Sequence, residues 1–170
     1  MSKKQKMLFR SSIFVNILVV LILVWGNITV NFSNDQLLYT EVQDNLIELE
    51  GLIGHQQQNN WSQANLVTQK TNEVLDGLYI SLNNGKYTKT ISKNDREILE
   101  KLFSKLRQFP QDKQYEFITL TPEDKENFVA LRTKLREVDL GLNITNNHHF
   151  DSIFDQLQSL EESIEAPLNP

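Results

Sequence analysis

Side chains that could support metal chemistry are few and scattered in this sequence. The histidines are His55, His148 and His149. Two adjacent residues point in different directions on a helix, whereas a helical metal pair needs a spacing of three or four. His148 with Asp151, and Asp151 with Asp155, have that spacing, but both pairs equally suit a solvated first helical turn, where acidic groups are favourable. We therefore predict no metal site.

Sequence frames for catalysis or cofactor binding are also missing. There is no G-x-S-x-G turn for a serine nucleophile and no G-x-x-x-x-G-K-[ST] loop for nucleotide phosphates. The adjacent carboxylates Glu161 and Glu162 lie in a helical charge pattern typical of a solvated face. Because the chain has no cysteine, disulfides, a thiol nucleophile and thiolate metal sites are excluded. The sequence predicts no catalytic residue, no cofactor and no enzyme.

The residues with the clearest purpose lie at the N-terminus and indicate a membrane anchor. Residues 11–30 carry no charge, and 20 helical residues span about 30 Å, the hydrocarbon thickness of a bilayer. Cations precede this run and none follows closely, which predicts a cytoplasmic N-terminus and an extracytoplasmic C-terminus. A tryptophan suits the interface, and an asparagine inside the run is either tolerated or hydrogen-bonded to a neighbouring helix. The anchor residues are Lys3, Lys4, Lys6, Arg10, Asn16 and Trp25.

A cleavable signal peptide is the alternative for this segment. Its most apolar part is short, and residues 24–26 loosely satisfy a small-residue cleavage rule, so cleavage after Gly26 would give a secreted protein. We favour the uncleaved anchor, because apolar residues continue through Ile28, Val30 and Phe32 and no A-x-A tripeptide occurs. Both interpretations export the rest of the chain.

The exported body is acidic. The whole chain has a formal charge of −5, but residues from Asp35 onward carry 13 basic and 22 acidic side chains, a balance of −9. Such a body is repelled by a phosphate backbone and by anionic lipid head groups. Nucleic acid is therefore not an expected partner.

Hydrophobic periodicity predicts an all-α body. Apolar residues recur at steps of three and four in five stretches, which begin near residues 35, 60, 92, 121 and 150. We expect N-caps at Asn60 (with Gln63), Ser92 (with Asp95) and Thr121 (before Pro122). Breaks are expected at the connector 54–60, at the turn 83–85, before Pro110 and at 166–167.

Each stripe covers one face only, so the helices must bury these faces together in an antiparallel bundle of four to five helices. The alternative for 86–91 and 114–120, which are rich in β-branched and aromatic residues, is a minor two-stranded ribbon. The expected organisation is a cytoplasmic tail 1–10, an anchor 11–30, a hinge 31–34, a bundle 35–166 and a tail 167–170.

The stretch LIELEGLIGHQQQNNWSQANLVTQKTNEVLDGL, behind a basic start and one hydrophobic segment, resembles small membrane-anchored helical proteins of spore-forming Gram-positive bacteria, a group without an assigned biochemical function. The resemblance rests chiefly on Trp61-x-x-Ala64 and implies an envelope location. Trp61 itself is either a core residue at the start of an apolar stripe or an exposed contact for a partner.

These observations favour a non-enzymatic accessory or scaffold subunit, anchored in the cell membrane, whose helical body binds another envelope protein. A second class is a bundle that senses a small molecule between its helices and signals through a partner membrane protein. The expected partners are the lipid bilayer and an envelope protein.

Overall fold

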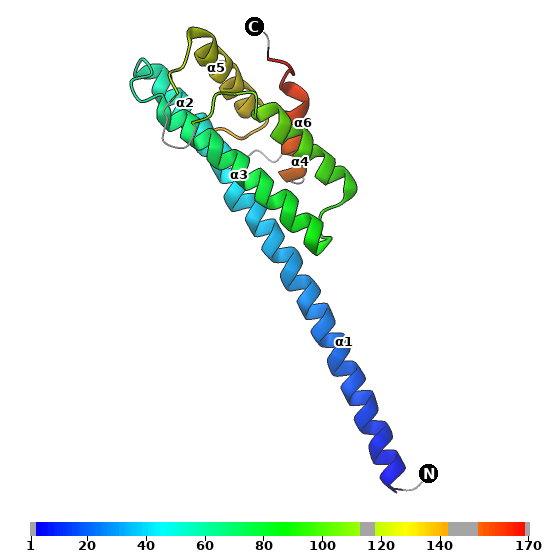
Figure 1. The fold of residues 1–170 in the computed structure, drawn as a ribbon. Helices are drawn as coiled ribbons and strands as arrows, with labels where there is room; N and C mark the ends of the chain where they lie inside the picture. Colours follow the sequence, from blue (N-terminus) through cyan, green and yellow to red (C-terminus); the bar gives the residue numbers. More distant parts are fainter. Residues whose placement is uncertain (1–2, 113–117, 143–152, 169–170) are drawn as a thin grey trace.

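The computed structural model describes residues 3–112, 118–142 and 153–168, and it is all-α, with no strand in those ranges. The chain forms a bundle at one end of a long helix whose N-terminal part extends away from it (Figure 1). The elements are α1 (Lys3–Leu37), η1 (Leu38–Gln43), α2 (Asp44–Gln58), α3 (Asn65–Thr88), α4 (Lys93–Leu106), α5 (Pro122–Glu137) and α6 (Ile153–Ser163).

The first three elements form one continuous helix of 56 residues, Lys3–Gln58. Residues 31–34, predicted as a hinge, continue this helix. They contain neither glycine nor proline, the residues that most often kink or break a helix. The helix also passes Gly51 and runs through the first five residues of the connector predicted at 54–60, so that it stops only after Gln58.

The two halves of the long helix have opposite surroundings. The apolar side chains between Met7 and Phe32 are exposed, whereas the stripe that begins at Leu38 is in the core. The predicted core stripe of the first helix is thereby confirmed. Its buried members are Leu38, Val42, Leu46, Leu49 and Ile53.

The long helix and α3 approach closely where η1 interrupts regular α-helix. η1 is a stretch of π-helix, a wider turn that lets an extra residue into the helix. Gly77 of α3 packs against it, and a methyl group at Gly77 would lie only 2.0 Å from the carbonyl oxygen of Glu41. Glycine is therefore required for this crossing.

The core is continuous through the bundle. α2 packs on α3 and α5, and α4 packs on α3 and α6. Phe128 of α5 is fully buried, and its ring centroid lies 5.3 Å from that of Phe109. As predicted, the helices are stabilised by side-by-side burial of one face each. The other largest fully buried side chains are Leu46, Leu49, Ile53, Leu78, Leu99, Leu102, Leu106, Leu131, Leu135, Leu140 and Leu157.

Two of the three predicted N-caps are confirmed. The Ser92 hydroxyl accepts a hydrogen bond from the Asp95 amide at 3.1 Å. Thr121 forms a full capping box with Asp124, at 3.1 Å and 2.8 Å for the reciprocal bonds, with Pro122 in the first turn. The cap at Asn60 is wrong, because Asn60 and Trp61 have positive φ angles of 52° and 58° and α3 begins only at Asn65.

The predicted turn at 83–85 is also wrong. α3 continues for a further turn and ends at Thr88, and Lys89 adopts the left-handed conformation, φ 56°. Residues 86–88, the first half of the suggested strand 86–91, are therefore helical, and 89–91 form no strand. Of the other suggested strand, 114–120, residues 114–117 lie outside the described residues and 118–120 form no strand.

The last two helices are shorter than their stripes. α5 stops at Glu137, although the apolar spacing of three and four continues through Val138 to Leu142, which lies beyond the helix and is 47% exposed. α6 ends at Ser163, before the terminator expected at 166–167. The predicted start of this helix at Phe150 lies outside the described residues.

Candidate functional site

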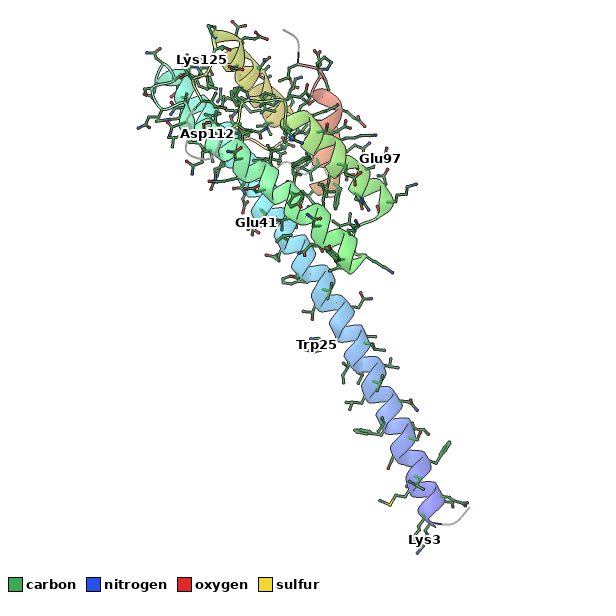
Figure 2. All side chains as sticks on the ribbon, viewed as in Figure 1. Lys3, Trp25, Glu41, Glu97, Asp112 and Lys125 are labelled. Carbon is green, nitrogen blue, oxygen red and sulfur yellow. The ribbon has the colours of Figure 1, made fainter. Side chains whose placement is uncertain are left out.

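The predicted anchor residues all lie on α1, on the part of the helix that projects from the bundle. Lys3 and Trp25 mark this projecting part in Figure 2. Lys3, Lys4, Lys6, Arg10 and Asn16 are exposed, and Trp25 is 76% exposed. In the part of the chain that the structure describes, one helix is long and apolar enough to cross a membrane. The rest of the protein buries none of its apolar stretch.

Trp61 lies at the opposite end of the bundle, in the α2–α3 loop. Its indole is half-buried, with its ring centroid 6.3 Å from that of Phe128. One side of it borders a hollow that is also lined by Ile118 and Leu120. The structure thus places Trp61 at the edge of the core, as the core interpretation expects, and leaves part of its ring accessible.

The loop around Trp61 is organised by Gln56, which the sequence placed in a polar connector. Gln56 is fully buried near the end of α2. Its Oε1 accepts a hydrogen bond from the Gln63 amide at 2.9 Å, and its carbonyl oxygen accepts one from the Trp61 amide at 2.7 Å. A buried amide is normally hydrogen-bonded, and here its bonds fix the loop between α2 and α3. Residues 54–58 therefore belong to the end of α2 and not to a connector.

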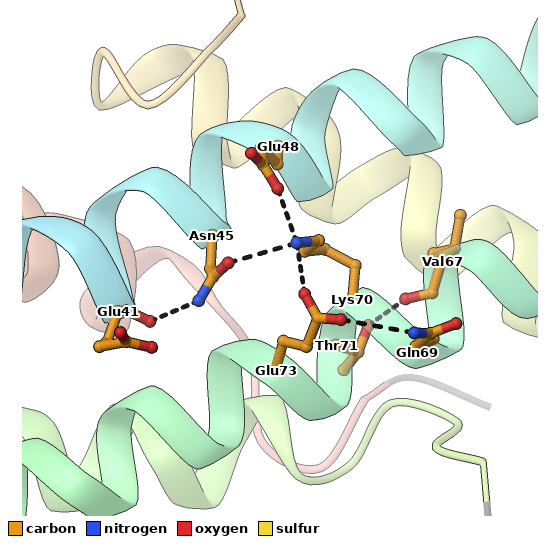
Figure 3. Close-up of polar contacts among 8 residues, drawn as sticks. All are labelled: Glu41, Asn45, Glu48, Val67, Gln69, Lys70, Thr71 and Glu73. Atoms are coloured by element: carbon orange, nitrogen blue, oxygen red, sulfur yellow. Dashed lines mark hydrogen bonds and ion pairs between the residues drawn. The ribbon is translucent and has the colours of Figure 1, made fainter.

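A first polar cluster joins α2 to α3 around Lys70 (Figure 3). Lys70 Nζ donates to Asn45 Oδ1 at 3.3 Å and to Glu48 Oε2 at 2.6 Å, and it pairs with Glu73. Burial acts to lower the pKa of Lys70, but the hydrogen bonds and charges of Glu48 and Glu73 outweigh it and raise the pKa above its ordinary value. The cluster holds its ammonium charged and fixed.

A second cluster joins α2 to α5 around Glu50, whose side chain is 1% exposed. Glu50 Oε1 accepts from Arg132 Nε at 2.9 Å and from Arg136 at 3.0 Å, and Oε2 accepts from the Leu142 amide at 2.7 Å. Both carboxylate oxygens are therefore occupied. The arrangement pairs a buried charge with two guanidinium groups and one backbone amide.

A third set of polar contacts holds α6 in place. Gln156 accepts from Gln43 of η1 at 2.8 Å and donates to the Val138 carbonyl at 3.3 Å. Lys105 and Lys134 donate to the carbonyl oxygens of Glu161 and Ser163, at 2.5 Å and 2.6 Å. These lysines act as C-terminal caps of α6 from neighbouring helices.

Sequence reasoning missed these inter-helix contacts, because each joins residues far apart in the chain. The exposed pair Glu97–Lys101, at 3.0 Å, has the helical spacing that sequence can detect. Its hydrogen bond lowers the pKa of Glu97 and raises the pKa of Lys101.

None of these clusters has the composition of a metal or catalytic site. Among the described residues, no group of three or more histidines, cysteines or carboxylates could hold a metal ion. His55 is exposed, with Nδ1 3.3 Å from Gln56 Nε2. His148, His149 and Asp151 lie outside the described residues, and Asp155 lies in the first turn of α6. The three polar clusters described above join neighbouring helices of the bundle.

Comparison of the chain with protein-family models, with curated proteins and with solved structures found no match.

Proposed function

We propose that this protein is a single-pass membrane protein whose extracytoplasmic helical bundle serves as an accessory or scaffold subunit of an envelope complex. The observation that carries the proposal is the long helix Lys3–Gln58, whose N-terminal half exposes apolar side chains and whose C-terminal half contributes core residues to the bundle. A bilayer is the environment that covers the exposed half without a protein partner.

Two features support an uncleaved anchor over a cleaved signal. Gly26 lies within a continuous helix, so the peptide bond after it is not in an open loop. Cleavage there would also leave Ile28 and Phe32, each 64% exposed, on a helix projecting into water. The four cations before the apolar run favour a cytoplasmic N-terminus by the positive-inside rule.

The placement can be tested in intact cells, because a chain without cysteine allows single-cysteine labelling without background. We expect a membrane-impermeant maleimide to label Gln57→Cys in intact cells and Lys4→Cys only after permeabilisation. N-terminal sequencing of the membrane fraction should return the uncleaved start. Full-length protein in the cytosol, or a mature chain beginning after Gly26, would contradict the anchor.

The scaffold role is tested separately by affinity purification in mild detergent. We expect a stoichiometric envelope protein to remain bound to the full-length chain, and to be lost when residues 35–170 are replaced by an unrelated helical bundle. A chain that always elutes alone would contradict this role, whatever its location.

The continuity of the long helix also supports the second candidate function, the sensing of a small molecule. A ligand that changes the packing of the bundle would act on the anchor through η1. A ligand at a hundredfold excess over its dissociation constant should stabilise the bundle by about 2.7 kcal/mol. A thermal-shift screen of the full chain that gives such a shift favours sensing over a purely structural role.

A further inference from the structure

The end of the bundle that lies nearest the projecting part of α1 carries a small basic surface. It is formed by the last turn of α3, the connection 89–92 and the first residue of α4 (Figure 1). We call it the basic tip and define it by four exposed residues, Lys86, Tyr87, Lys89 and Lys93. Tyr87 is 82% exposed, the highest value among the large hydrophobic side chains of the described residues.

Helix register places the basic tip beside the end of the apolar run. α3 runs antiparallel to the long helix, and Gly77 lies against Glu41. Eleven residues further along α3, at Thr88, correspond to eleven residues back from Glu41, at Val30, since both helices rise by about 1.5 Å per residue. Val30 is the last residue of the run 11–30 that is predicted to span the membrane, and the first charged residue after it is Asp35. If that run spans the bilayer, the basic tip lies at the head-group level.

The charge of the basic tip is opposite to that of the bundle as a whole. No acidic residue occurs from Gly77 to Asn94, although the chain from Asp35 onward has a balance of −9. Within the described residues, Lys86, Lys89 and Lys93 form no ion pair. The ammonium groups of Lys86 and Lys89 are therefore available to an external anion, and that of Lys93 interacts with Glu97 through its charge without forming an ion pair.

Helix stability explains only part of this arrangement. Lysines near the C-terminus of α3 are favourable to its dipole, but Lys93 begins α4, where the dipole favours an anion instead. The tip is also held in shape. Ile91 of the connection packs onto Gly85, where a methyl group would lie 2.2 Å from Ile91 Cδ1, and Ser92 caps α4.

We propose that the basic tip rests on the anionic head groups of the membrane in which α1 is anchored. Lysines this close to a surface are attracted by negatively charged lipids, and their aliphatic stems follow the interface while the ammonium groups contact phosphates. Tyrosine is enriched at the same level of membrane proteins. The net charge of the bundle predicts repulsion from anionic lipids, but the basic tip is attracted to them.

This inference rests on the proposed anchoring, so the experiment measures the anchoring of α1 and the lipid contact of the basic tip with separate labels. Full-length single-cysteine variants carrying an environment-sensitive fluorophore are reconstituted in vesicles of phosphatidylcholine alone or with phosphatidylglycerol. Quenchers are attached either at the lipid head group or deep in the acyl chain. Tyr87→Cys reports the basic tip and Leu21→Cys reports the span. Gln57→Cys, about 40 Å beyond Val30 on the same helix, is the remote control.

We expect the deep quencher to act on Leu21→Cys, and the head-group quencher to act on Tyr87→Cys but not on Gln57→Cys. Contact at Tyr87→Cys should increase with the fraction of phosphatidylglycerol. Replacing Lys86, Lys89 and Lys93 by glutamine should lower the contact equilibrium about fivefold per lysine. The matched control, glutamine at Lys101, Arg107 and Lys125, should leave it unchanged.

Quenching of Leu21→Cys without quenching of Tyr87→Cys would overturn the lipid contact and leave the anchor intact. Absence of quenching at both positions would overturn both. Equal quenching of Tyr87→Cys in neutral and anionic vesicles would also contradict the proposal. So would loss of contact on adding millimolar inorganic phosphate at constant ionic strength, because the basic tip would then bind a free anion instead of lipid.

Discussion

Replacing Glu50 by glutamine should destabilise the bundle much more than its small change in volume suggests. In the wild type, Oε1 accepts from two guanidinium groups and Oε2 accepts from the Leu142 amide, at distances between 2.7 Å and 3.0 Å. A side-chain amide offers one acceptor oxygen and one NH₂ group, which can only donate. Whichever way it turns, its NH₂ group therefore faces another donor, either Arg132 and Arg136 or the backbone.

The magnitude follows from the contacts that are lost. Hydrogen bonds to a charged group contribute roughly 1.5 to 3 kcal/mol, and a neutral bond about 1 kcal/mol. One orientation of the glutamine weakens two charge-assisted bonds and loses the third. Because Arg132 and Arg136 are 31% and 44% exposed and can turn toward water, we expect a loss of about 2 to 4 kcal/mol instead of the larger value for an enclosed pair.

The assay is thermal unfolding of the full-length protein in detergent, followed by near-ultraviolet circular dichroism. Glu97→Gln is the matched control, since it makes the same substitution in an ion pair that is exposed on both sides, with Glu97 58% and Lys101 56% exposed. An exposed ion pair contributes little to stability, so the control should be nearly neutral. Equal effects of the two substitutions would refute the view that the buried Glu50 carboxylate stabilises the packing of α2 on α5.

Three further substitutions test other contacts of the bundle. Gly77→Ala should destabilise by about 1 to 3 kcal/mol despite the higher helix propensity of alanine, because its methyl group meets the Glu41 carbonyl, and thermal unfolding measures the loss. Thr121→Ala should cost about 1 kcal/mol by the same measurement, through loss of the α5 cap. For Lys70, whose pKa is raised, the stabilisation is complete below the unfolded-state pKa and is lost as pH rises through the folded value. The wild type should therefore lose more stability than Lys70→Met above about pH 10, in melting curves recorded against pH.

The parts of the fold that local physics determines could be read from the sequence. The apolar residues from Leu38 to Ile53 recur at spacings of three and four, so they lie on one face only if the segment is a helix. That face is buried, as predicted. The caps at Ser92 and Thr121 depend on residues three positions apart, so they were also predictable. The length and lack of charge of residues 11–30 likewise depend on no distant contact.

The errors occurred where tertiary contacts override local preference. Asn83 and Gly85 resemble a turn, but packing of Gly85 against Ile91 favours one more turn of helix. Gln56 resembles a connector residue, but its buried amide holds the following loop. The Glu50 cluster joins residues more than 80 positions apart, which no local pattern reveals.

The central claim is that one unbroken helix carries the apolar segment and enters the core of the bundle, and its most direct test is a distance across residues 31–34. Spin labels at Leu21→Cys and Tyr39→Cys, in the full chain reconstituted in a bilayer, should give by double electron–electron resonance a single narrow distribution near 27 Å, as a straight helix requires. A broad distribution, or one centred at a clearly shorter distance, would show a hinge at 31–34 and contradict the account.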